Sequence, residues 1–140
     1  MMTKTRRVAV VLAAVAGGFA TAANAASLEA LQGAWTMDGT GCDDTFEKVG
    51  SDIRFKDRTS TLTTGILVKG DKILGSNLSC TAEKVREEAE KGTYSVMLNC
   101  ADALMFQTVS TTFKVTGPDS FQRFDPGFPD ISFAYQRCKL

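Results

Sequence analysis

Three aspartates near the start of the chain are the residues best placed for acid–base chemistry. Asp38, Asp43 and Asp44 surround the turn signal Gly39-Thr40-Gly41. Paired carboxylates can hydrolyse glycosides, and carboxylate oxygens can bind calcium, although this spacing differs from an EF-hand loop. Aspartate is also typical of turns and helix N-caps, where its side chain accepts hydrogen bonds from the backbone. We expect that structural role here, with calcium binding and catalysis as the alternatives.

The chain contains no histidine, which removes much of the usual catalytic and metal-binding chemistry. Ser–His and Cys–His nucleophilic sites, histidine general bases and most transition-metal sites are excluded. The sequence also lacks a glycine-rich phosphate loop and a dinucleotide-binding fingerprint. We therefore expect a protein that is not an enzyme and that has no catalytic residues, no cofactor and no metal.

Four cysteines, Cys42, Cys80, Cys100 and Cys138, predict two disulfides. Zinc binding would need closely spaced pairs or histidine ligands, and the chain offers neither. Folding the segment between Cys80 and Cys100 into a hairpin centred on Glu90 places these two cysteines opposite each other. Cys42 would then pair with Cys138, which requires the first and last strands to lie close together.

The same hairpin register makes further pairings testable. It places Ala82 opposite Leu98 and Lys84 opposite Val96, with residues 87–92 as a charged tip. On the second arm, side-chain alternation puts Tyr94, Val96, Leu98 and Cys100 on one face. A helix over residues 82–91 is the alternative, because Glu, Lys, Arg and Ala are good helix formers. The thin apolar stripe of that segment favours the hairpin.

Short strands separated by turn signals follow one another along the chain. We expect strands over residues 33–37, around Ile53 and Phe55, and over 61–68, 104–115, 121–124 and 131–138, after a short helical lead-in at 27–32. The two prolines of residues 125–130 lack backbone donors, so this segment should interrupt the ladder. The pattern predicts an all-β domain, specifically a small antiparallel up-and-down β-barrel of about eight strands stapled by two disulfides.

The first 25 residues are typical of a cleavable signal peptide. Lys4, Arg6 and Arg7 precede an apolar run over residues 8–20, and Ala23-Asn24-Ala25 forms a cleavage site. A transmembrane anchor is the alternative, but the run is shorter than a spanning helix needs. We expect residues 26–140 to form one exported domain, periplasmic or secreted, without membrane insertion after cleavage. That domain is mildly acidic and has no basic run, so no nucleic-acid partner is expected.

The aromatic residues allow two interpretations. Trp35, the two tyrosines and most of the phenylalanines lie after residue 26, and they are large enough to fill the interior of a small barrel. Some of them could instead line a cavity that is open at one end. We expect a filled core.

Gly33-Ala34-Trp35, together with Arg137 in the last strand, resembles the calycin pattern of lipocalins and avidins. The opening Leu31-Gln32-Gly33-Ala34-Trp35 is also similar to that of bacterial periplasmic protease inhibitors. The resemblance implies an eight-stranded barrel in which Arg137 packs across Trp35 at the closed end. It names no residue that contacts a ligand, and the inhibitor family has one disulfide where this chain has four cysteines.

Three classes of function follow, of which binding is favoured over catalysis. The chain is expected to be an exported, non-catalytic binding protein of the bacterial cell envelope, either an inhibitor or an interaction module acting on another protein. Residues 26–32 and 125–130 are the segments that could contact such a partner. The alternatives are a lipocalin-like carrier of a small apolar ligand and, less favoured, a carboxylate-dependent hydrolase. The oligomeric state is left open.

Overall fold

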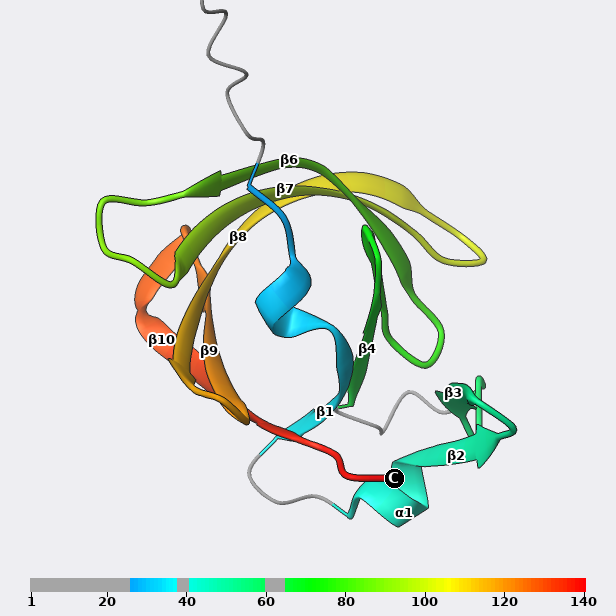
Figure 1. The fold of residues 1–140 in the computed structure, drawn as a ribbon. Coiled ribbons are helices and arrows are strands. Elements are labelled where there is room, and N and C mark those ends of the chain that lie inside the picture. Colours follow the sequence, from blue (N-terminus) through cyan, green and yellow to red (C-terminus); the bar gives the residue numbers. More distant parts are fainter. Residues whose placement is uncertain (1–25, 38–40, 60–64) are drawn as a thin grey trace, which may run out of the picture.

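The computed structural model describes residues 26–37, 41–59 and 65–140, and its main feature is a closed β-barrel of eight strands (Figure 1). Around the barrel the strands follow the order β1, β10, β9, β8, β7, β6, β5, β4, with all neighbours antiparallel. The predicted fold class is therefore confirmed. The predicted signal peptide, residues 1–25, lies outside the described residues.

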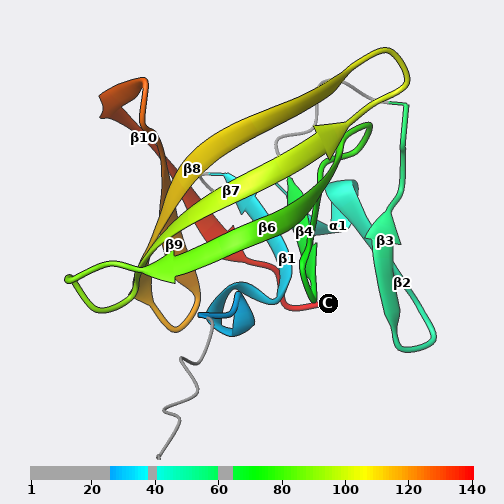
Figure 2. The ribbon, with the colours of Figure 1, turned by 90° about the horizontal axis from the view of Figure 1, so that it is seen from above.

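The barrel strands are β1 (Gly33–Met37), β4 (Ile66–Lys69), β5 (Lys72–Leu74), β6 (Ser79–Glu87), β7 (Thr93–Ala101), β8 (Phe106–Gly117), β9 (Ser120–Asp125) and β10 (Phe128–Arg137). A 3-10 helix, η1 (Glu29–Leu31), precedes β1 and lies across one end of the barrel (Figures 1 and 2). We call this the closed end. The turns β5–β6, β7–β8 and β9–β10 lie at the opposite end, which we call the open end.

Side-chain alternation along the strands produces the barrel core. In β1, Trp35 points into the barrel while Ala34 and Thr36 point outward. Leu28 and Leu31 from the η1 segment are buried in the same inner cluster. Burying each large apolar side chain of this kind stabilises a fold by about 1.5–3 kcal/mol.

A second hairpin lies outside the barrel. After the short helix α1 (Cys42–Thr45), β2 (Phe46–Val49) pairs with β3 (Asp52–Phe55) and with no barrel strand. The rings of Phe46 and Phe55 are 4.9 Å apart and are buried in an outer cluster with Ala34 and Leu67, from the outer faces of β1 and β4. The strand at Ile53 and Phe55 was expected, but its position outside the barrel and its partner β2 were not.

The β6–β7 hairpin forms, and no helix occurs over residues 82–91. Cys80 lies opposite Cys100 and Ala82 opposite Leu98, as predicted. The expected pairing of Lys84 with Val96 is wrong, because a register shift between Ala82 and Lys84 places Val85 opposite Val96 instead. The extra residue turns the apolar Val85 toward the core and the charged Lys84 toward solvent, which removes the mismatch.

The start of β10 corrects a second expectation. Residues 125–130 were predicted to interrupt the ladder, yet β10 begins at Phe128 and includes Pro129. Phe128 pairs with Asp125, and regular pairing with β9 resumes only at Ser132. Pro129 therefore falls in the irregular stretch, where its missing N–H removes no ladder hydrogen bond.

Both predicted disulfides are present, Cys42–Cys138 and Cys80–Cys100. Trp35 of β1 pairs with Arg137 of β10, so Cys138 emerges directly beside β1 and reaches Cys42. This bridge joins the outer α1 segment to the end of the barrel wall. The second bridge links β6 to β7 inside the barrel.

Removing the two bridges should have unequal effects. In the loop-entropy model, a bridge across 96 positions contributes about 4–5 kcal/mol and a bridge across 20 positions about 3 kcal/mol. The paired replacement Cys42→Ala with Cys138→Ala should therefore lower the free energy of unfolding more than Cys80→Ala with Cys100→Ala. Urea unfolding of both variants measures the difference. An equal or reversed order would contradict the larger contribution of Cys42–Cys138 to stability.

Candidate functional site

The structure brings Trp35 and Arg137 together at the closed end. Trp35 is 1% exposed, and the Arg137 guanidinium carbon lies 4.1 Å from the centre of its ring. The indole N–H donates to the Leu31 carbonyl at 2.8 Å, so its one polar group is satisfied. A cation over an indole face is attracted by the ring quadrupole.

Arg137 uses its remaining donors to hold the surrounding backbone. Its guanidinium donates to the carbonyls of Gln32, Ala30 and Pro118, and its Nε lies 3.1 Å from a carboxylate oxygen of Asp119. Gly33 has a φ of 114°, and a Cβ there would lie 3.0 Å from the Arg137 guanidinium. The glycine of the Gly-x-Trp sequence is thus needed both for its backbone angle and for the close approach of Arg137.

An aromatic cluster fills the half of the barrel next to Trp35. Phe121 contacts Trp35 edge-on at 4.7 Å, stacks on Tyr135 at 4.9 Å and meets Phe113 edge-on at 5.7 Å between ring centres. All four side chains are buried. We call these residues the aromatic plug. In this half, the expected filled core is what the structure contains.

The open half contains a cavity of about 260 Å³. Its lining is mainly apolar and includes Ile66, Ile73, Leu78, Leu98, Val109, Phe113, Phe133 and the Cys80–Cys100 bridge, with Gln107, Thr111, Arg123 and Asp125 as polar members. Phe113 is shared with the aromatic plug, which therefore forms the floor of the cavity. The expectation of a filled core fails here, because the strands continue beyond the plug without large side chains to close the space.

Exposed apolar side chains flank the open end. Leu104, Met105 and Phe106 lie in and beside the β7–β8 turn, and Phe106 is 73% exposed. Phe128, 63% exposed, and Ile131 lie at the start of β10. Figure 2 shows the two hairpin tips projecting on the side of the barrel away from η1. We call these five residues the apolar tips.

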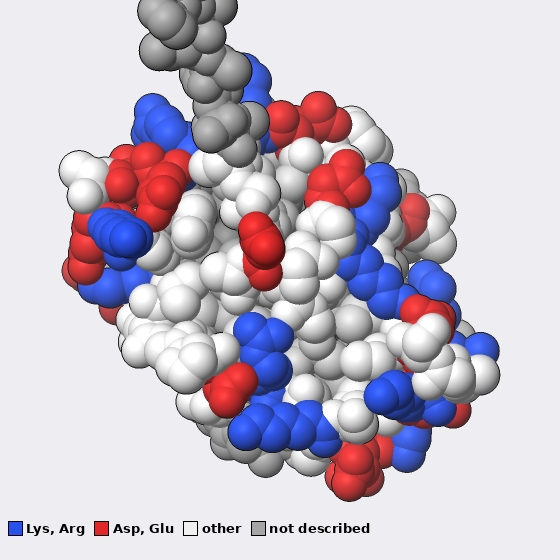
Figure 3. Space-filling model, viewed as in Figure 1, with Lys and Arg blue, Asp and Glu red and all other residues white. Residues whose placement is uncertain are grey.

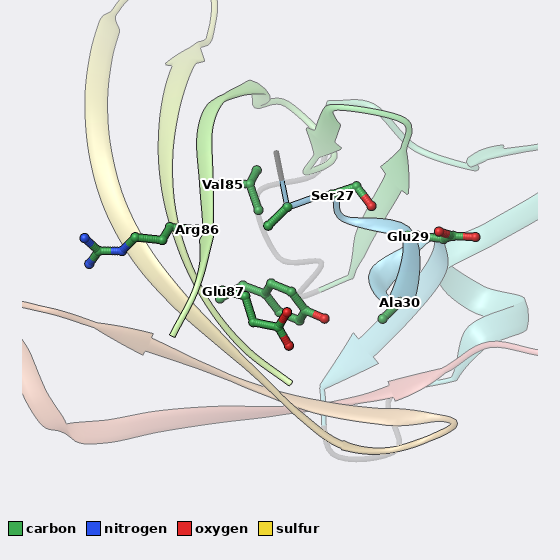
Figure 4. A pocket seen from close by; sticks show the side chains of 8 residues that line it. Ser27, Glu29, Ala30, Val85, Arg86 and Glu87 are labelled. Atoms are coloured by element: carbon green, nitrogen blue, oxygen red, sulfur yellow. The ribbon is translucent and has the colours of Figure 1, made fainter. Parts of the chain in front are cut away.

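A second hollow lies at the closed end, between the η1 segment and the β6–β7 hairpin (Figure 4). Glu29 and Ala30 line one side, and Val85, Arg86 and Glu87 line the other. It is wide and open, and acidic and basic side chains are mixed over this face of the molecule (Figure 3). Ala26, Ala30, Val85 and Tyr94 give it apolar groups, but it is wider and more open to solvent than the cavity at the open end, so it encloses a small ligand less well.

The acidic residues predicted near the first turn do not form a site with the cavity. Asp43 and Asp44 are exposed in α1, on the outside of the barrel, and Asp38 lies outside the described residues. The described ranges contain no cluster of three or more potential metal ligands. Within the same ranges, no helix has the length and hydropathy needed to cross a membrane.

The sequence analysis missed Arg123, the only cation that lines the cavity among the described residues. The signal that could have found it is the alternation in β9. Phe121 points inward, so Arg123, two residues later, shares its face and also points into the barrel. The same alternation places Phe133 and Tyr135 inward on β10, beside Arg123.

Truncating the closed-end residues should reduce stability to different extents. Trp35→Ala should cost about 3–5 kcal/mol, as expected for a buried tryptophan. Arg137→Ala should cost about 1–2 kcal/mol, because it removes the cation–π contact and several charged hydrogen bonds from a partly exposed side chain. Urea unfolding measures both, and Trp35, the only tryptophan, should emit further to the red in Arg137→Ala.

The conservative variant Arg137→Lys provides the control for charge alone. Lysine keeps the positive charge but cannot donate hydrogen bonds in several fixed directions. The free energy of unfolding of Arg137→Lys should therefore lie between those of Arg137→Ala and the unmodified protein. Emission from Trp35 that already resembles indole in water would contradict the closed-end arrangement.

Comparison of this chain with models of protein families, with curated proteins and with solved structures finds no match. The calycin resemblance of Gly33, Trp35 and Arg137 therefore stays a prediction. The geometry of the barrel is what remains for inferring a function: a closed end crossed by η1 and Arg137, an aromatic floor and an apolar cavity at the open end.

Proposed function

We propose that this chain is an exported, non-catalytic binding protein that holds a small, largely apolar ligand in the open end of its barrel. The apolar cavity of about 260 Å³ above the aromatic plug carries this proposal. Ligand sites are concave, mainly apolar and contain a few polar groups that orient the ligand. The cavity has this composition, and Arg123, Thr111 and Gln107 are candidates for the orienting groups.

The size of the cavity limits the ligand. Small-molecule sites usually enclose roughly 300–1,000 Å³, so this cavity is just below the lower end of that range. One short chain or one ring system fits these dimensions better than a lipid with two tails. The Cys80–Cys100 bridge forms part of the wall, and joining β6 to β7 covalently limits the widening of the cavity.

Two disulfides support placement of the protein outside the cytoplasm. Such bonds persist in oxidising compartments and are rare in the reducing cytosol. Together with the signal-like residues 1–25, they favour the periplasm or the extracellular medium. Within that setting, the ligand would be a compound present in the cell envelope or in its surroundings.

Binding is favoured over hydrolysis by the position of the acidic residues. Asp43 and Asp44 lie exposed on the outer surface, away from the cavity. Asp125 lines the rim of the cavity, but its side chain accepts a hydrogen bond from the backbone N–H of Gly127. Its exposed carboxylate is already hydrogen-bonded within its own turn, which is a poor position for a general acid that must reach a bound substrate.

Filling the cavity should abolish binding of a neutral apolar probe. Val109→Trp adds a large side chain to the cavity wall, whereas Thr108→Trp adds the same group next to it on the outer face of β8. Titration of N-phenyl-1-naphthylamine should show saturable fluorescence enhancement with the unmodified protein and with Thr108→Trp. Affinity should fall at least about tenfold in Val109→Trp, because the tryptophan displaces the probe.

Thermal unfolding of both variants checks that they fold. No saturable binding to the unmodified protein, or equal binding by Val109→Trp, would contradict the proposed ligand site.

A second candidate function, docking onto another protein, is favoured by the apolar tips. Single exposed apolar residues are common, but three large ones on the β7–β8 hairpin and two on the β9–β10 hairpin give each tip an apolar patch suited to a partner. An inhibitor or interaction module of the cell envelope would use these residues rather than the cavity.

The double variant Phe106→Ser with Phe128→Ser tests this candidate. If the tips bind a partner, crosslinking in cells should lose a defined adduct in this variant while binding of N-phenyl-1-naphthylamine stays unchanged. The single variant Leu104→Ser serves as a milder change on one hairpin. Unchanged crosslinking in the double variant would argue against a role for the tips.

A further inference from the structure

Arg123 is the cavity residue whose bonding is least complete. Its guanidinium carbon lies 5.0 Å from the ring centre of Phe133 and 5.9 Å from that of Tyr135. Among the described residues, no carboxylate lies within ion-pairing distance and no carbonyl accepts a hydrogen bond from its side chain. The side chain is half-buried and lines the cavity.

Arg137 shows what a structural arginine looks like in the same barrel. It also lies over an aromatic ring, but it pairs with Asp119 and donates to three backbone carbonyls. Arg123 has the ring contacts without the acceptors. Its planar group is therefore held in place by Phe133 and Tyr135 while its N–H donors are left for another partner.

Within the described residues, no acidic side chain forms an ion pair with Arg123. Burial raises the pKa of the Tyr135 phenol, so this group is neutral at physiological pH. Asp125 shares the cavity lining, but it is exposed at the rim and bonded to the β9–β10 turn. A guanidinium half-removed from water and lined by apolar groups gains most from an anionic ligand.

We propose that the ligand of the cavity is a single-chain amphipathic carboxylate. Its head group would accept two parallel hydrogen bonds from Arg123, and its apolar chain would lie against Leu98, Val109 and Phe113. This inference rests on the proposed ligand site and adds the chemical class of the ligand. The volume of about 260 Å³ suits one short chain.

Three probes with the same chain and different head groups test the charge preference. Octanoate, octanamide and octylammonium are titrated into the purified protein by isothermal calorimetry. Octanoate should bind about tenfold more tightly than octanamide, because a charged hydrogen bond to a guanidinium is stronger than a neutral one. Octylammonium should bind most weakly. Added salt should reduce the difference in affinity between octanoate and octanamide, because it screens the charge of Arg123.

Variants at Arg123 show whether that residue causes the preference for octanoate. Arg123→Gln should bind octanoate and octanamide equally. Arg123→Lys should keep part of the preference for octanoate, because lysine retains the charge but cannot donate two parallel hydrogen bonds from a planar group. Arg54→Gln is the matched control: it changes the net charge equally, but Arg54 lies on the outer β2–β3 hairpin, paired with Glu47. It should bind all three probes as the unmodified protein does.

Asp125→Asn should raise the affinity for octanoate, whereas Arg123→Gln should lower it. Asparagine can still accept the bond from Gly127, and removing the negative charge at the rim should tighten octanoate binding about twofold to threefold, with no change for octanamide.

The outcomes separate the two proposals. If octanoate and octanamide bind equally, and Val109→Trp abolishes both, the cavity is a ligand site but Arg123 does not select an anion, and the inference is overturned. If no probe binds, the proposed ligand site fails and the inference fails with it. A preference for octanoate that survives in Arg123→Gln would also overturn the assignment to Arg123.

Discussion

One guanidinium group organises the closed end of the barrel. Arg137 lies in the last strand, yet it contacts the tryptophan of the first strand, the carbonyls of the η1 segment and the β8–β9 turn. These contacts link parts of the chain that are 19 to 107 positions apart. A barrel closes only when its first and last strands pair in one register, and Arg137 contributes to that pairing from the inside.

Sealing one end determines where a ligand could lie. The half of the barrel next to Trp35 is filled with side chains. η1 and Arg137 lie over Trp35, and Phe113, Phe121 and Tyr135 pack behind it. The largest buried side chains, Trp35, Phe113, Phe121 and Phe46, lie in this half and in the outer cluster. The open half can then contain a cavity, because the packing lost around the cavity is offset by the close packing of the aromatic plug.

Local periodicity predicted most of the barrel strands, and hairpin symmetry predicted the disulfides, but β2 and the features that depend on tertiary packing were missed. The register of Cys80 and Cys100 follows from hairpin symmetry, whereas the shift after Ala82 results from turning Val85 inward. The β2–β3 hairpin alternates like a barrel strand, and only contact with Ala34 and Leu67 reveals that it packs outside. The inward orientation of Arg123 could have been predicted from that of Phe121, two residues earlier. Its lack of hydrogen-bond acceptors becomes apparent only when the neighbouring strands are in place.

The Cys42–Cys138 bridge has a topological consequence. It spans 96 positions and turns nearly the whole barrel into one covalent ring. Exposed turns are where proteases cut first, and the charged β6–β7 tip and the apolar tips all lie within that ring. One broken peptide bond in any of these turns leaves both fragments joined, with their strands still side by side. In surroundings rich in proteases, the molecule tolerates a first nick without falling apart.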